Sequence, residues 1–282
     1  MSETATANAE QISGISFTKK SGYALCHFTD LSNEIKELLK KQLSFICYGQ
    51  SASQSDLNVY NYTNTLKEFL TRYESKNNDK QKGMIGELLS HLVINKFFSE
   101  YHVVSPFFNK EERSVKKGFD VVLSSKKNHD IWITEVKSGE LHKNKDSDAT
   151  TADLLATANR DLVDRLNGEN LSLWLNAIND AKIVFERHSD LKDAIVEILD
   201  GYGSKGIDSA LTSAEMNVFL VSALFAPLSD LISLKATERK TRSIESSKSF
   251  KALFVLSMQK ETYTKVYEFL KEESGGNGKR KN

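Results

Sequence analysis

DIWITEVKS, residues 130–138, is the most informative stretch of the chain. Its β-branched and aromatic residues predict a strand. Successive side chains of a strand point to opposite faces, so Glu135 and Lys137 should share a face with Ile133, while Val136 points the other way. Two opposite charges on one face of an apolar strand indicate a partner or a bound ion, because burying an isolated charge is unfavourable.

Two further carboxylates precede this strand. Asp120 interrupts the apolar run GFDVVLSS (118–125), a second predicted strand, and Glu87 lies in KGMIGELL on a helix predicted from Lys82 to about Phe98. Convergent carboxylate oxygens suit a hard divalent cation, either Mg²⁺ or Mn²⁺, which also takes oxygens from a substrate phosphate.

A lysine beside such a cation can orient water or offset charge that develops on the phosphate. The pattern therefore predicts metal-dependent phosphodiester hydrolysis, with Asp120, Glu135 and Glu87 as metal ligands and Lys137 as a catalytic residue. The alternative is a plain salt bridge between Glu135 and Lys137, with Asp120 at a turn or strand edge. Any one of these residues alone favours that alternative, whereas their joint order along the chain favours the metal site.

Composition shifts divide the chain into four parts. We expect a disordered tail (1–11), an N-terminal αβ unit (12–57), a larger domain (58–273) and a flexible basic tail (274–282). In the αβ unit, a hairpin is expected at 15–28, then a helix carrying Ile35, Leu38 and Leu39, and then a buried strand at LSFICYG (43–49).

The larger domain alternates between helical and extended patterns. Strands are predicted at 101–108, 118–125 and 130–138, and again from Met216 and from Phe250; helices are predicted at 58–73, 82–98, from about 150, at 170–186, 189–200 and 261–273. This order is of the α/β or α+β type. GxGxxG at 201–206 follows a helical pattern and not a strand, so we expect glycines that end a helix and not a dinucleotide site.

Composition excludes several classes of protein. Lys plus Arg equals Asp plus Glu, 38 each, so the chain is not a strongly basic nucleic-acid coat protein. It lacks an apolar run of about 18 residues and an N-terminal signal pattern, so we expect a cytoplasmic protein without a membrane partner. Cys26 and Cys47 are too few for a disulfide framework or a cysteine-based zinc site.

Lysines flank the predicted site. Lys116 and Lys117 precede the Asp120 strand, and Lys143 and Lys145 follow Glu140. Together they could contact a DNA backbone at the rim of the site, although each lysine alone is more typical of a solvated surface.

These motifs resemble those of the PD-(D/E)xK nuclease superfamily. The resemblance implies a restriction-endonuclease-like αβββαβ core over about residues 80–225, with an N-terminal αβ extension and added helices. It assigns the helix Glu to Glu87, the strand Asp to Asp120 and the Glu-x-Lys to Glu135 and Lys137. Phe119 stands where many members carry proline, at a position that varies widely.

KGMIGELLSHLVINKFF from Lys82, KKGFDVVL from Lys116 and WITEVKSGE from Trp132 resemble more closely the HamA family, nuclease subunits of the bacterial Hachiman anti-phage system, and the related AbpA proteins. This resemblance implies a Mg²⁺-dependent DNA endonuclease or nickase. It also implies a helicase partner, HamB in Hachiman, that restrains the nuclease and releases it to degrade DNA without sequence specificity. Two alternatives stay open: a regulatory subunit with a lapsed nuclease site, and a standalone restriction or repair nuclease.

Overall fold

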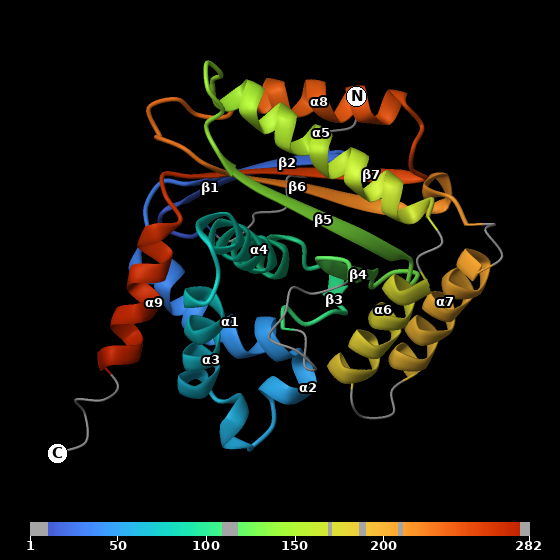
Figure 1. The fold of residues 1–282 in the computed structure, drawn as a ribbon, viewed down its shortest axis with the longest axis horizontal. Coiled ribbons are helices and arrows are strands. Elements are labelled where there is room, and N and C mark those ends of the chain that lie inside the picture. Colours follow the sequence, from blue (N-terminus) through green and yellow to red (C-terminus); the bar gives the residue numbers. More distant parts are fainter. Residues whose placement is uncertain (1–10, 109–117, 169–170, 186–189, 208–210, 277–282) are drawn as a thin grey trace.

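The computed structural model describes residues 11–108, 118–168, 171–185, 190–207 and 211–276. The strands in chain order are β1 (Ile15–Lys20), β2 (Tyr23–Phe28), β3 (Tyr101–Val103), β4 (Val121–Ser125), β5 (Ile131–Glu140), β6 (Asn217–Phe225) and β7 (Ala252–Lys260). The α-helices are α1 (Asn33–Tyr48), α2 (Gln50–Ser53), α3 (Tyr62–Glu74), α4 (Asn78–Phe97), α5 (Ser147–Leu166), α6 (Leu171–Val184), α7 (Asp190–Ile207), α8 (Leu234–Ser246) and α9 (Thr264–Gly276). Figure 1 shows their arrangement.

The strands of the described residues form one mixed sheet in the order β1-β2-β7-β6-β5-β4-β3. The central strands β2, β7, β6 and β5 are parallel, and the two ends of the sheet, β1 with β2 and β5 with β4 and β3, are antiparallel. The chain therefore has the expected mixed α/β architecture. β1 and β2, from the predicted N-terminal unit, belong to the same sheet as the later strands.

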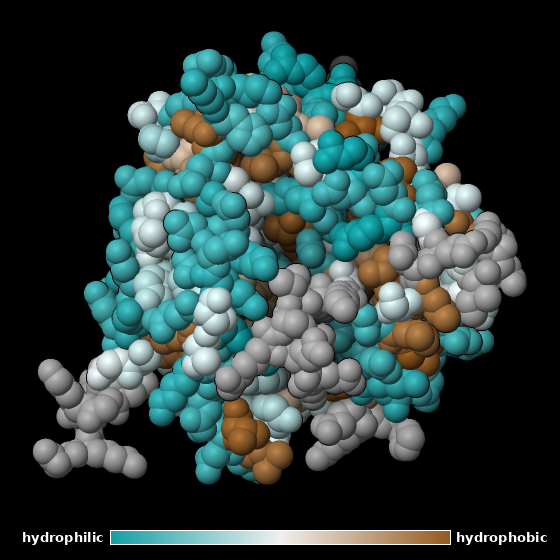
Figure 2. Space-filling view, in the orientation of Figure 1, coloured by the Kyte–Doolittle hydropathy of each residue, from teal (hydrophilic) through white to brown (hydrophobic). Residues whose placement is uncertain are grey.

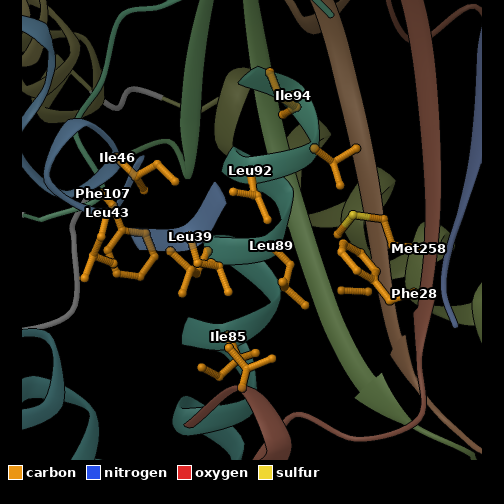
Figure 3. Close-up of a cluster of buried hydrophobic side chains, with 14 of the residues drawn as sticks. Phe28, Leu39, Leu43, Ile46, Ile85, Leu89, Leu92, Ile94, Phe107 and Met258 are labelled. Carbon is orange, nitrogen blue, oxygen red and sulfur yellow. The ribbon is translucent and has the colours of Figure 1, made fainter. Parts of the chain in front are cut away.

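Helices cover both faces of the sheet. α4, with α1, α3 and α9, lies on one face, while α5 and α8 lie on the other and α6 and α7 stand beside the β4 end (Figure 1). Figure 3 shows Leu89 and Leu92 of α4 between α1 and the strand residues Phe28 and Met258. α4 is thus buried between a helix and the sheet, which is why its apolar residues cover a wide face.

Residues 43–49 are helical, so the predicted strand there is wrong. Leu39, Leu43, Ile46 and Cys47 continue the buried face that Ile35 begins, at helical spacing, and α1 runs to Tyr48. Gly49 ends the helix with a positive φ of 85°, a conformation that glycine adopts without strain. A short apolar run cannot by itself distinguish a buried strand from the last turns of a buried helix.

The predicted strand at 101–108 is shortened to β3. Pro106 has no backbone N–H to donate to a sheet. The N–H groups of Phe107 and Phe108 donate instead to the carbonyls of Ile46 and Cys47, two acceptors left open at the end of α1.

Several helix boundaries also differ from the sequence predictions. α4 starts before Lys82, since the Asn77 side chain accepts a hydrogen bond from the Lys80 N–H and caps the helix. α7 continues through the GxGxxG glycines to Ile207, and α9 continues three residues past the predicted end at 273, to Gly276. Among the helices described, none is long and apolar enough to cross a bilayer.

Candidate active site

Strands β4 and β5 part at the centre of the candidate site. Their antiparallel pairing ends at Val121 opposite Thr134, and one further step in this register would place Asp120 opposite Glu135. Among the described strands, only β6 pairs with β5 beyond this point. The Asp120 side chain serves here as the hydrogen-bond acceptor that the β4 backbone supplies earlier along β5. Its Oδ2 accepts a hydrogen bond of 2.7 Å from the Val136 N–H. Asp120 is therefore fixed against the backbone that carries Glu135 and Lys137.

The alternation predicted for β5 is confirmed. Ile133 belongs to the core beneath α5, whereas Trp132 and Val136 pack against the core around α4. Glu135 and Lys137 share the face of Ile133, where α5 crosses β5 and β6. Figure 2, in the orientation of Figure 1, shows a mostly hydrophilic surface. This surface is hollowed near its centre, where Figure 1 places β5 between α4 and α5.

Ion pairs surround Glu135, whose side chain is only 3% exposed. Its Oε1 accepts a hydrogen bond of 2.8 Å from the Lys137 ammonium, and its Oε2 is paired with the Arg165 guanidinium of α5. The Lys137 ammonium also lies 3.0 Å from Asp161 Oδ2. Arg165 further donates to the Gly118 carbonyl at 3.1 Å. A buried carboxylate is thus compensated by two cations.

The same ion pairs lower the pKa of Asp161. Burial acts to raise its pKa, but the hydrogen bond and charge of Lys137, together with Arg160, outweigh burial and hold the pKa below its ordinary value. Asp161 is therefore an anion at neutral pH and keeps the Lys137 ammonium between two carboxylates.

Glu87 is on α4, which packs against β5 from the other face of the sheet. It follows Gly86, the point where α4 comes closest to the strand: a Cβ added at Gly86 would lie 1.9 Å from the Ser138 Oγ. Glu87 is also near Cys47 of α1. Burial raises the pKa of the Cys47 thiol well above its ordinary value, and the negative charge of Glu87 adds to this rise. Hydrogen bonds join Asp120, Glu135 and Lys137 through β5, whereas the helix that carries Glu87 lies on the opposite face of the sheet.

The donor set is compatible with a divalent cation in its chemistry but small. Asp120 and Glu135 supply carboxylate oxygens, and Mg²⁺ is commonly bound by one or two carboxylates with water and substrate phosphate completing the shell. Across the described ranges, no group of three or more histidine, cysteine, aspartate or glutamate side chains is arranged to hold a metal.

Two of the four predicted rim lysines, Lys143 and Lys145, are among the described residues. Lys116 and Lys117 lie outside the described residues. Lys143 is exposed after β5, and Lys145 is paired with Asp153 Oδ2 at 2.5 Å. Asp153 and Asp161 are separated by about 12 Å along α5 at the usual helical rise. Lys145 therefore contacts α5 two turns away from the ion pairs around Glu135.

Sequence reasoning missed Asp161 and Arg165, the α5 residues that contact the two charged β5 side chains. α5 also carries Arg160 and Asp164, so charge type alone does not distinguish the inward-facing members of this group. Spacing from buried residues is the available signal, because Asp161 lies three residues after Ala158 and Arg165 three residues after Leu162. This spacing places both side chains near the buried face of α5 without identifying their partners on β5.

Other motifs have structural roles. Asp146 caps α5 by accepting from the Ala149 N–H, and Asp148 accepts from the Ser233 backbone and hydroxyl groups at the start of α8. Trp174, expected to pack, is buried against Phe119.

A protein-family model described as HamA matches residues 9–273 of the chain. No curated protein sequence matches significantly. The family match spans all the residues of the candidate site, from Glu87 on α4 to Arg165 on α5.

Proposed function

The chain belongs to the HamA family, the defence subunit of the Hachiman anti-phage system, and from this we propose that it is the Mg²⁺-dependent DNA nuclease of that system. The proposed reaction is hydrolysis of phosphodiester bonds in DNA without sequence specificity, with Mn²⁺ as an alternative metal. One observation carries the proposal: Asp120 is bonded to the strand backbone between Glu135 and Lys137. This juxtaposition joins the three residues Asp120, Glu135 and Lys137 that the reaction needs.

The order of elements also supports a PD-(D/E)xK core. α4 is followed by β3, β4 and β5, then by α5 and, after α6 and α7, by β6. This is the expected αβββαβ order with two helices inserted before the last strand. In this proposal the core holds Glu87 on its first helix, Asp120 before its second strand and the Glu-x-Lys pair on its third.

Each site residue then has a definite task. Asp120 and Glu135 would hold the divalent cation, with Glu87 as a further carboxylate ligand or as a hydrogen-bonding neighbour of the ligands. A bound Mg²⁺ would supply Lewis acidity toward a phosphate oxygen and a more acidic water. Lys137 lies between Glu135 and Asp161, and its ammonium can orient the attacking water or offset charge on the phosphate.

The partner in this proposal is a HamB-like helicase, because Hachiman systems combine HamA with the helicase HamB. We propose that the helicase restrains the nuclease and brings it to DNA. The balanced charge, 38 basic against 38 acidic residues, supports this division of labour. A neutral protein gains little from counterion release, so its own grip on DNA should be modest.

The test is a plasmid-nicking assay on the full chain, alone and with its helicase, in Mg²⁺ and in EDTA. We expect nicking in Mg²⁺ only, and a loss of at least about a hundredfold in Glu135→Gln and in Lys137→Met, since the first removes a proposed metal ligand and the second removes the ammonium that offsets charge on the phosphate. Glu140→Gln is the matched control, because Glu140 is on the same strand but is 59% exposed and pairs with Lys82.

The controls separate the alternatives. Wild-type chain that leaves DNA intact with and without the helicase would mean a lapsed nuclease site. Nicking that persists in EDTA, or in Glu135→Gln at the wild-type rate, would refute the proposed chemistry. Full nicking with no restraint by the helicase would favour a standalone nuclease.

A further inference from the structure

α5 carries one acidic and one basic residue that pair with the two charged residues of β5. Their spacing matches that of the β5 residues, and each has the opposite charge to its partner. Arg165 meets Glu135, and Asp161 meets Lys137. Four residues of helix advance by about 6 Å, and two residues of strand advance by about 6.6 Å. Because α5 runs in the opposite direction to β5 through these contacts, both ion pairs form together when the helix lies on the strand.

Arg165 occupies a position where a metal ligand should have an open side. Of the two Glu135 oxygens, Oε1 is hydrogen-bonded to Lys137 and Oε2 is paired with Arg165. Arg165 also donates to the Gly118 carbonyl, two residues before Asp120. Its guanidinium therefore links the backbone segments that carry the two proposed metal ligands.

We propose that Arg165 is a latch: its guanidinium takes the Glu135 oxygen that a divalent cation would use, so the cation binds only when Arg165 leaves. The inference rests on the metal site proposed above. A guanidinium and a divalent cation at one carboxylate oxygen repel each other, and the repulsion is strong where the carboxylate is shielded from water, as Glu135 is.

Asp161 keeps its position through this change. It holds the Lys137 ammonium at 3.0 Å, so Lys137 remains oriented when Arg165 releases Glu135. The latch thus separates two tasks on one helix: Arg165 controls access to the carboxylate, and Asp161 positions the lysine.

A permanent structural ion pair predicts the opposite result. If Arg165 served only to hold Glu135 in place, its removal would loosen the carboxylate and weaken metal binding. If Arg165 is a latch, its removal frees an oxygen and strengthens metal binding. The sign of the change in affinity distinguishes the two roles.

The experiment measures Mn²⁺ binding to the purified full chain by isothermal titration calorimetry, with free Mn²⁺ checked by electron paramagnetic resonance. Arg165→Gln should bind Mn²⁺ about tenfold more tightly than wild type, since a competing unit charge is removed. Arg165→Lys should stay close to wild type. The matched control is Arg160→Gln, which removes the same charge from the same helix at a side chain that is 67% exposed and pairs with Asp161 instead of Glu135.

Unchanged or weaker binding by Arg165→Gln, in a protein whose thermal melt shows that it is folded, overturns the latch. So does equal tightening in Arg160→Gln, because the effect would then be one of general charge. Glu135→Gln separates this failure from failure of the proposed function: it should abolish Mn²⁺ binding with or without Arg165. Binding that survives in Glu135→Gln overturns the metal site itself, and the latch with it.

Discussion

Gly86 allows α4 to approach β5, and replacing it with alanine tests how tight this approach is. The new Cβ would lie 1.9 Å from the Ser138 Oγ, 2.9 Å from the Ser138 Cβ and 3.1 Å from the Ala223 Cβ. Ser138 can rotate its hydroxyl away but not its Cβ, so the helix or the strand must shift.

Overpacking of this kind typically lowers the free energy of unfolding by about 1–3 kcal/mol, while alanine in place of glycine in a helix raises it by up to about 1 kcal/mol. We therefore expect Gly86→Ala to lower the free energy of unfolding by about 1–2 kcal/mol. Gly83→Ala is the matched control on the same helix, where a Cβ would have nothing within 4 Å. It should raise the free energy of unfolding by about 0.5–1 kcal/mol.

Urea unfolding followed by far-ultraviolet circular dichroism measures both changes, provided that the slopes of the transitions agree. Adding Ser138→Gly to Gly86→Ala should restore part of the loss, because it removes the two closest atoms. If Gly86→Ala stabilised the protein as much as Gly83→Ala, helix propensity alone would govern the site and the close approach of α4 to β5 would be refuted.

Two further predictions concern residues away from the site. Asp148→Ala should lower the free energy of unfolding by about 1–2 kcal/mol in urea titrations, because it removes both 2.7 Å bonds to Ser233 at the start of α8; the exposed Asp164→Ala should change little. Lys260 is 3% exposed, and burial lowers its pKa. Its charge therefore opposes folding below the lowered pKa, and the penalty fades as pH rises through that value. Lys260→Met should raise Tm by about 2–4 °C at pH 7 and by less near pH 10; a lower Tm at pH 7 would contradict this reasoning.

The face pattern of β5 could be predicted because a strand alternates strictly. Once residues 130–138 were taken as a strand, Glu135 and Lys137 had to share a face with Ile133, as they do. Segments with few large apolar residues were less tractable. α8 was not predicted, since its buried residues include Ala236, Thr237 and Thr241, which carry little hydrophobic signal.

The partners of the β5 charges could not be predicted, for a different reason. Arg160, Asp161, Asp164 and Arg165 lie within two turns of α5, and each could pair with a charge on the strand. Only the way in which α5 lies across β5 selects Asp161 and Arg165, and that alignment depends on contacts between segments distant in sequence. A local pattern therefore located the strand half of the site and left the helix half undetermined.

The position of β7 in the sheet has a consequence for synthesis on the ribosome. Among the described strands, β7 lies between β2 and β6, so the hairpin of β1 and β2 joins the rest of the sheet through a strand that follows all the others in the chain. The core around α4 likewise includes Leu256, Met258 and Leu270. A nascent chain synthesised as far as β6 already contains Asp120, Glu135 and Lys137, but the β1–β2 hairpin still lacks β7, the strand with which β2 pairs. Completion of the sheet is thus a late event in synthesis, and chains truncated before Ala252 retain the charged site residues without the strand that unites the sheet.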